Sequence, residues 1–255
     1  MSRAPDAKSL GDRMKEYESS SQLRLPRRMP VIIRLDGKAF HTWTKGLDLP
    51  FDDTFIGMMA ATAKFLVDNI QGAVFAYGQS DEISIMLRNY DSLNTDPWYD
   101  NNIQKIVSVS ASLATAKFNE LAAQHLENPK LAFFDSRVWV MPKEEVVNYF
   151  IWRQQDATRN SIRAVAHHYL GHNAILGKNN NEVQDMLMAM DVPVNWNDYE
   201  IYKKRGYCYN SLSKVVDQYI PIFSASRDYV ALHLEKQEEI TLEEMQLVIG
   251  DDDET

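Results

Sequence analysis

Two acidic turns, each directly after a short apolar run, constrain the fold of this 255-residue chain more than any other feature. The run Val31–Ile33 leads into Arg34–Gly37 (RLDG), and the run Ala73–Tyr77 leads into Gly78–Glu82 (GQSDE). Short runs of β-branched or aromatic residues that close on glycine are typical of buried strands rather than helices. The sequence therefore predicts carboxylates at the ends of two strands. Hard oxygen ligands in such a place suit Mg²⁺, which binds one or two carboxylates and leaves its other positions to water and phosphates.

The composition narrows the class of protein. Hydrophobic residues make up 45% and charged residues 25% of the chain, which is ordinary for a soluble globular protein. The single cysteine, Cys208, excludes an internal disulfide and a cysteine-rich zinc site, and we expect it to be a buried thiol. No apolar stretch approaches the roughly 20 residues that span a bilayer, and the N-terminus has no hydrophobic signal core. We therefore expect a cytoplasmic protein.

The net charge of −9 is unevenly distributed along the chain. Residues 235–255 hold nine acidic side chains and one lysine, so the rest of the chain, with 27 acidic and 26 basic residues, is nearly neutral. Basic residues gather at Arg24–Arg28, at Lys203–Arg205 and between Arg153 and Arg163. Such patches can bind phosphates even when the total charge is negative, although any one of them alone is more often a solvated face.

An amphipathic helix is predicted at 9–20, and strands and helices alternate after it. They are a strand at 31–33, a helix at 54–70, a hairpin of strands at 73–77 and 83–87, a helix at 103–126 and a strand at 131–141. This β-α-β-β-α-β order predicts an α+β, ferredoxin-like fold. Polymerase and cyclase palm domains share the topology and carry metal-binding acids on the first strand and on the central hairpin, where the acidic turns of this chain lie.

The second half of the chain has a different pattern. From Glu144 onward the apolar spacing is helical, at 144–170, 182–190 and 198–205. We therefore expect a palm-like catalytic domain with the N-terminal helix at 1–142 and a helical region at 143–235. Residues 236–255 form an acidic tail with little apolar content, which we expect to be disordered.

Four short segments, taken together, resemble the tRNAHis guanylyltransferase family. They are Arg34–His41 (RLDGKAFH), Gly78–Ser84 (GQSDEIS), Phe134–Val140 (FDSRVWV) and Trp152–Asp156 (WRQQD), and they follow one another in the family's order. The resemblance covers about residues 8 to 210. It implies a metal-dependent nucleotidyltransferase that adds nucleotides to the 5′ end of a tRNA in the 3′-to-5′ direction.

The resemblance implies a site with two Mg²⁺ ions. Asp36, Asp81 and the Gly37 carbonyl would bind the metals, and Glu82 is a third acid that matters for activity in the family. In a two-metal site one ion activates the attacking oxygen and the other neutralises the triphosphate and leaving group. Taken singly, Asp36 before Gly37 would more often be a turn former. Period-2 alternation points Glu82 away from Asp81, so its role is less defined.

Other site residues also follow from the resemblance. Main-chain N–H groups after the first acidic turn would bind the nucleotide triphosphate, as oriented amides bind anions elsewhere. The predicted nucleotide-binding residues are Lys38, Ala39, Phe40, His41, Lys45 and Ser80. The predicted ligands of the RNA 5′-phosphate are Arg34, Arg137, Arg153 and Asp156, because guanidinium groups match phosphate oxygens and Asp156 can orient Arg153 from i+3 on a helix. On their own, Phe40 would be read as core and the Arg153–Asp156 pair as a surface ion pair.

One segment departs from the eukaryotic members of the family. Those enzymes have the sequence HINNLYN after the fourth motif, whereas residues 158–164 of this chain are TRNSIRA. In this respect the chain resembles the bacterial, archaeal and phage proteins, which repair 5′-truncated tRNAs by templated addition. The expected substrates are ATP, GTP and either tRNAHis or truncated tRNAs, and the family implies a homotetramer built as a dimer of dimers.

The expected reaction is ATP-dependent 5′ adenylylation of the tRNA, followed by attack of the incoming nucleotide's 3′-hydroxyl. The helical region 143–235 would contribute to RNA and nucleotide binding. Two alternatives remain. A palm-type nucleotide cyclase would use the same two aspartates on a single nucleotide, although the arginine-rich segment 153–163 favours a longer anionic substrate. A non-catalytic RNA-binding module would keep the fold, but it would have little reason to retain all three acids.

Overall fold

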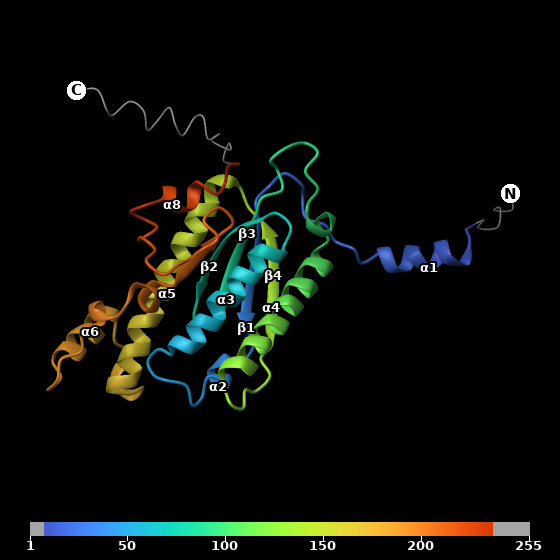
Figure 1. The fold of residues 1–255 in the computed structure, drawn as a ribbon. Coiled ribbons are helices and arrows are strands. Elements are labelled where there is room, and N and C mark those ends of the chain that lie inside the picture. Colours follow the sequence, from blue (N-terminus) through green and yellow to red (C-terminus); the bar gives the residue numbers. More distant parts are fainter. Residues whose placement is uncertain (1–7, 237–255) are drawn as a thin grey trace, which may run out of the picture.

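The computed structural model describes residues 8–236 and is built around one six-stranded antiparallel sheet (Figure 1). The strand order is β4-β1-β3-β2-β5-β6. The strands are β1 (Val31–Gly37), β2 (Ala73–Gln79), β3 (Glu82–Leu87), β4 (Phe134–Val140), β5 (Tyr207–Asn210) and β6 (Val216–Asp217). The first four have the predicted ferredoxin-like order, so the predicted α+β fold class is confirmed.

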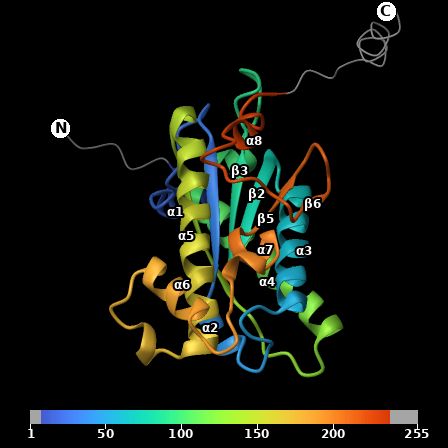
Figure 2. The same cartoon turned by 90° about the vertical axis from the view of Figure 1, so that its left-hand side faces the viewer.

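Helices cover both faces of the sheet. They are α1 (Leu10–Ser19), α2 (Phe40–Trp43), α3 (Asp53–Asn69), α4 (Ile103–His125), α5 (Lys143–Leu170), α6 (Asn180–Met188), α7 (Ile201–Arg205) and α8 (Asp228–Ala231). Short 3₁₀ turns lie at Trp98–Asn101, Asn173–Ile175 and Trp196–Asp198. Figure 2 shows the sheet lying between α5 on one side and α3 on the other. In the described part of the chain no helix is both long enough and apolar enough to cross a membrane.

The face under α3 and α4 holds the larger core. Alternate residues of β1, Val31, Ile33 and Leu35, point into it and are fully buried. The apolar stripe of α3 packs against them, as its sequence periodicity predicts, and Asp52 caps the helix by accepting a hydrogen bond from the Phe55 N–H at 2.7 Å. This core fixes β1 in register with its neighbours, and the register places the side chains at its C-terminal end.

The opposite face carries the second core, under α5. Ile32 of β1 and Phe75 of β2 pack here against Val146 and Phe150 of α5, together with Ile220 from the C-terminal segment. The sequence pattern predicted no strand after residue 141, but β5 pairs with β2 and β6 pairs with β5. That prediction was wrong because β5 and β6 are only four and two residues long, too short for alternation to be visible. The region after residue 143 therefore adds strands to the sheet as well as helices.

Two helices lie away from the sheet. α6 packs on the C-terminal half of α5 through a separate cluster that includes Ile162, Val165, Val183 and Leu187. The predicted N-terminal helix is present as α1, where the Ser9 side chain accepts a hydrogen bond from the Asp12 N–H, and it projects from the body with no buried residue (Figure 1). The predicted disordered acidic tail lies outside the described residues from 237 onward.

Candidate active site

The two acidic turns meet at one end of the sheet. β2 and β3 are joined by the two residues Ser80 and Asp81, and Ser80 has a φ of 48°, a left-handed conformation that is uncommon outside glycine. The Gly37 N–H donates to the Asp81 carbonyl at 3.0 Å, which ties the end of β1 to this turn. Asp36 pairs across the sheet with Glu82. The pairing of β1 with β3 therefore brings together residues that are about 45 positions apart in the sequence.

Gly37 is required by the packing beneath it. A Cβ atom at this position would lie 2.3 Å from the ring of Phe40, closer than real Cβ contacts allow. Phe40 is buried in the larger core, with its ring centroid 5.1 Å from that of Phe134 and 5.5 Å from that of Phe118. Its side chain therefore serves packing, and a contribution of Phe40 to nucleotide binding could come only from its main chain.

A cavity of about 430 Å³ opens where the turns meet α5. Its lining combines residues of β1, of the β2–β3 hairpin and of α5, namely Arg34, Asp36, Gln79, Ser80, Asp81, Glu82, Trp152, Arg153, Asp156 and Asn160. Seven of the predicted site residues are in this set. Gln79, Trp152 and Asn160 were not predicted as site residues. The sequence does place Trp152 inside a motif, but nothing in it shows that its side chain is exposed.

The electrostatics favour a cation between the two aspartates. Burial raises the pKa of Asp81, and the nearby carboxylate of Asp36 raises it further. The hydroxyl of Ser80, which donates to Asp81 at 3.1 Å, and His41 both oppose this shift of the pKa. A carboxylate whose charged form is disfavoured by burial and by a neighbouring carboxylate is stabilised in the ionised form by a bound cation.

Glu82 is adjacent to Asp81 but has a different environment. Both of its carboxylate oxygens accept hydrogen bonds from Arg153, from Nε and Nη2, each at 2.7 Å, and both residues are buried. Burial raises the pKa of Glu82, whereas the guanidinium groups of Arg153 and Arg34 lower it. Glu82 was predicted as a catalytic residue, the third acid of the site, and the structure places it in a bidentate ion pair. It therefore anchors α5 to the hairpin beside the aspartates.

The same pair limits what Arg153 can do. Arg153 Nη2 also donates to Asp156 at 3.2 Å, which is the i, i+3 contact that the sequence predicted. Two of its three guanidinium nitrogens are thus engaged by carboxylates, and the side chain is only 6% exposed. Arg153 is better placed to position Glu82 than to bind a phosphate as a free guanidinium.

The side chains of Arg34 and Arg137 are more exposed to solvent than that of Arg153. They are opposite each other on β1 and β4, so their side chains share the face that also carries Asp36. The Nη2 atoms of Arg34 and Arg137 lie 3.8 Å and 3.9 Å from the same oxygen of Asp36. Arg137 is 55% exposed. Two guanidinium groups beside a carboxylate that is predicted to bind metal are suited to binding an anion close to a cation.

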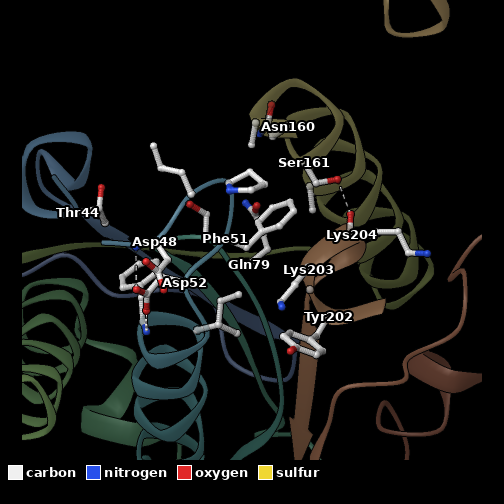
Figure 3. A pocket seen from close by; sticks show the side chains of 18 of the residues that line it. Thr44, Asp48, Phe51, Asp52, Gln79, Asn160, Ser161, Tyr202, Lys203 and Lys204 are labelled. Carbon is white, nitrogen blue, oxygen red and sulfur yellow. Dashed lines mark hydrogen bonds between the residues drawn. The ribbon is translucent and has the colours of Figure 1, made fainter. Parts of the chain in front are cut away.

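A second cavity, of about 220 Å³, adjoins the first and shares Gln79, Ser80 and Asn160 with it. Its walls come from the loop before α3, from α5 and from α7 (Figure 3). The further lining residues are Thr44, Leu47, Asp48, Leu49, Pro50, Phe51, Asp52, Phe55, Ile56, Ala157, Ser161, Ala164, Tyr202, Lys203, Lys204, Gly206 and Tyr207. No local motif marks these residues, because they converge only when β5 pairs with β2 and α7 packs against α5.

Of the basic cluster at 203–205, the two lysines already have protein partners. Lys203 Nζ lies 3.0 Å from Asp53 and 3.3 Å from Glu200, and this cluster raises its pKa. Lys204 is buried and its Nζ donates to the Asn197 carbonyl at 2.6 Å. Both lysines still line the smaller cavity. This segment therefore contributes positive charges that are held in place by protein partners, rather than mobile side chains on the surface.

The remaining predicted residues lie outside both linings. They are Gly37, Lys38, Ala39, Phe40, His41, Lys45 and Arg137. The Lys38 N–H donates to the Phe133 carbonyl at 2.8 Å in this structure, whereas the prediction has main-chain N–H groups of this segment binding the triphosphate. Among the described residues the N–H groups of Ala39, Phe40 and His41 have no such partner, and they precede or begin α2.

Within residues 8–236 no cluster of three or more His, Cys, Asp or Glu side chains is arranged to hold a metal. The predicted set has only two such side chains, Asp36 and Asp81, and its third ligand is a main-chain carbonyl. All three donors are oxygens, as Mg²⁺ prefers, and two carboxylates leave room for water and phosphate. The raised pKa of Asp81 is an independent feature that fits a cation at this point. The residues present therefore fit Mg²⁺.

Comparison with known proteins agrees with this geometry. The sequence model of the tRNAHis guanylyltransferase family matches residues 11–142, which include both acidic turns. A tRNAHis guanylyltransferase of Debaryomyces hansenii is 31% identical over 219 residues, which are 78% of this chain and 79% of that protein.

Two solved structures are more similar still. A bacterial tRNAHis guanylyltransferase-like protein in complex with ATP is 50% identical, with a TM-score of 0.85, over 89% of this chain and 99% of that one. Another such bacterial structure, in complex with GTP, is 45% identical, with a TM-score of 0.76 and the same coverage. The fold, the paired aspartates and the matched sequence all lead to one conclusion: this chain belongs to the tRNAHis guanylyltransferase family.

Proposed function

We propose that this protein adds nucleotides, GTP by preference, to the 5′ end of tRNA in the 3′-to-5′ direction, after ATP-dependent adenylylation of that end. The observation that carries the proposal is the convergence of Asp36 and Asp81 on a cavity that adjoins a second cavity. The bacterial relatives bound to ATP and GTP support nucleotide substrates. The replacement of the eukaryotic HINNLYN segment by residues 158–164 supports repair of 5′-truncated tRNAs over strict tRNAHis guanylylation.

Mg²⁺ is the metal that the site would take. Asp36, Asp81 and the Gly37 carbonyl would hold two ions, whose chemistry is to activate the attacking oxygen and to shield the phosphate charge. Both bond-forming steps require an attacking oxygen aligned with a shielded phosphorus, and neither requires a covalent protein nucleophile.

The smaller cavity is suited to the nucleoside of the incoming nucleotide. Its walls combine apolar groups, such as Phe51 and Ile56, with a few polar ones, including Asn160 and Lys203. Pockets of this composition bind small ligands by shape and fix their orientation by a few polar contacts. Ser80 lines both cavities, so a nucleotide bound here would direct its phosphates past the turn toward Asp81.

The 5′-phosphate of the RNA would lie near Arg34 and Arg137, which flank Asp36. In the first step an oxygen of this phosphate attacks the α-phosphorus of ATP, and pyrophosphate leaves. In the second, the 3′-hydroxyl of the incoming nucleotide attacks the 5′-phosphorus of the RNA, and AMP leaves. An RNA that already carries a 5′-triphosphate skips the first step and releases pyrophosphate in the second.

The assembly and location of the protein are part of the same proposal. A cytoplasmic homotetramer is what the family implies, and the exposed Leu10, Met14 and Tyr17 on the projecting α1 support contacts with another subunit. A helix of this length is only marginally stable by itself in water, so its apolar side needs a partner.

The test is a set of tRNAs that lack their first nucleotide and carry each of the four possible opposing bases. We expect the labelled nucleotide complementary to the opposing base to be joined, in an ATP-dependent reaction on 5′-monophosphorylated RNA. A cyclic nucleotide formed from ATP or GTP without RNA would replace the proposal by a cyclase. RNA binding without incorporation, in the presence of Mg²⁺ and all nucleotides, would replace it by a binding module.

A further inference from the structure

One aromatic side chain at the rim of the larger cavity is exposed without an obvious structural reason. Trp152 lines this cavity, yet it is 48% exposed. The other lining residues are polar or charged, and they include Asp36 and Asp81, proposed above to bind metal, and Arg34, proposed to bind phosphate. An exposed indole beside these groups offers a ligand a flat apolar ring next to polar and charged contacts.

The indole is also held in one orientation. The Arg153 guanidinium carbon lies 4.5 Å from its ring centroid, and the ring of Tyr149 lies 5.9 Å away at an angle of 58°. Arg153 is itself fixed by its two hydrogen bonds to Glu82 and by a third to Asp156. A tryptophan supported by a cation on one side and exposed elsewhere is pre-organised to stack against a planar ligand.

We propose that Trp152 is a stacking platform for the base of the 5′-terminal nucleotide of the RNA. This inference rests on the proposed function, because it assigns the RNA end to the larger cavity. Each base has a flat π-face, so such a platform holds the RNA end without reading its sequence. The phosphate of the same nucleotide then lies toward Arg34 and Asp36, which share the cavity with Trp152.

The terminal base of the RNA fits this place better than the base of the incoming nucleotide. The smaller cavity offers enclosing apolar walls for a free nucleotide, whereas Trp152 stands at the open mouth of the larger one. A polymer end must enter from solvent with the rest of the molecule outside, and of these two cavities the larger one combines this access with Asp36 and Asp81. Sequence-tolerant stacking also suits an enzyme that must accept different terminal base pairs during repair.

The experiment measures binding of two RNAs in the absence of turnover. One is a 5′-truncated tRNA whose terminal base is 2-aminopurine, and the other is the same RNA with an abasic nucleotide there. We expect Trp152→Ala to bind the first RNA roughly tenfold more weakly than the wild type, and to abolish the quenching of 2-aminopurine that stacking causes. Both proteins should bind the abasic RNA alike within about twofold. Trp152→Phe should keep most of the affinity.

The control variant is Tyr219→Ala, which removes another exposed aromatic side chain that lines neither cavity. It should bind both RNAs like the wild type. Equal losses for Trp152→Ala on the two RNAs, or no loss on either, would overturn the platform, as would a rise in the KM for ATP with RNA binding unchanged. Failure of the proposed function itself is seen separately, as wild-type protein that joins no nucleotide to any RNA.

Discussion

Asp81 and Glu82 are neighbours in sequence at the same turn, but the structure gives them opposite environments. Asp81 faces an open cavity together with Asp36, and within residues 8–236 the guanidinium groups beside Asp36, those of Arg34 and Arg137, stay 3.8 Å and 3.9 Å away. Glu82 is buried and held by Arg153 at 2.7 Å through both oxygens. Asp36 and Asp81 are therefore arranged for a cation from solution, and Glu82 for a cation supplied by the protein.

The largest effect should follow from removing either open carboxylate. We expect Asp36→Ala or Asp81→Ala to lower nucleotide incorporation by roughly a thousandfold or more, because the lost charge stabilisation is on the order of 4 kcal/mol. RNA binding should remain measurable, since neither aspartate attracts phosphate directly. Incorporation of labelled GTP into truncated tRNA and a filter-binding assay on the same samples measure both quantities. Normal incorporation by both variants would remove the metal assignment.

Breaking the ion pair between Glu82 and Arg153 should lower the free energy of unfolding. Arg153→Met leaves the buried Glu82 carboxylate without its partner, and we expect unfolding to become easier by about 3–5 kcal/mol. The double variant Arg153→Met, Glu82→Gln should recover a large part of this loss, because the buried carboxylate is then no longer charged. Chemical denaturation of the three proteins gives the comparison. A single variant as stable as the wild type would show that the pair is not coupled to folding.

The two regions also differ in how far the sequence could predict them. Asp36 and Asp81 follow local patterns, a short apolar run and a glycine-containing turn, so their position at strand ends was predicted and is what the structure has. The link between Glu82 and Arg153 spans 71 residues, and no local pattern encodes which acid an arginine on a distant helix will meet. Only the Arg153–Asp156 contact, three residues apart on α5, was accessible to the sequence.

The smaller cavity could not be predicted for the same reason. Its walls need β5 beside β2, and the four-residue β5 gives no alternation to detect. Gly78 shows how closely β2 and β5 pack, because a Cβ atom at this position would lie 2.5 Å from the ring of Tyr207. The fold of residues 31–140 therefore follows from periodicity and order, whereas the smaller cavity depends on long-range pairing.

A smaller effect should come from the backbone beneath the open pair. Gly37→Ala places a methyl group against the Phe40 ring, and overpacking of this kind typically costs about 1–3 kcal/mol. We expect a lower unfolding temperature and a clear loss of incorporation, because the end of β1 that carries Asp36 must shift. Phe40→Leu in the same background should restore part of the stability by making space. A double variant no more stable than Gly37→Ala would show that Phe40 is not the obstacle.

The smallest effect is a change in unfolding temperature, and its sign should differ between Asp81→Asn and Glu82→Gln. The pKa of Asp81 is raised in the folded protein, chiefly by burial, so its ionised form costs stability. Its favourable contribution is complete below the ordinary value of 3.8 and is lost as the pH rises through the raised pKa. At pH 7 without metal, Asp81→Asn should therefore unfold at a slightly higher temperature than the wild type, and the gain should vanish in acid.

Glu82→Gln is the matched variant for this test. Burial raises the pKa of Glu82 as well, but Glu82→Gln also takes away the carboxylate to which two nitrogens of the buried Arg153 donate. The guanidinium left without that partner should lower the unfolding temperature. Mg²⁺ should raise the unfolding temperature of the wild type and of Glu82→Gln but not that of Asp81→Asn, because only the last variant lacks a metal ligand. If both amide variants shifted in the same direction, the division between an open and a paired acid would be wrong, since two carboxylates in equivalent environments respond alike to losing their charge.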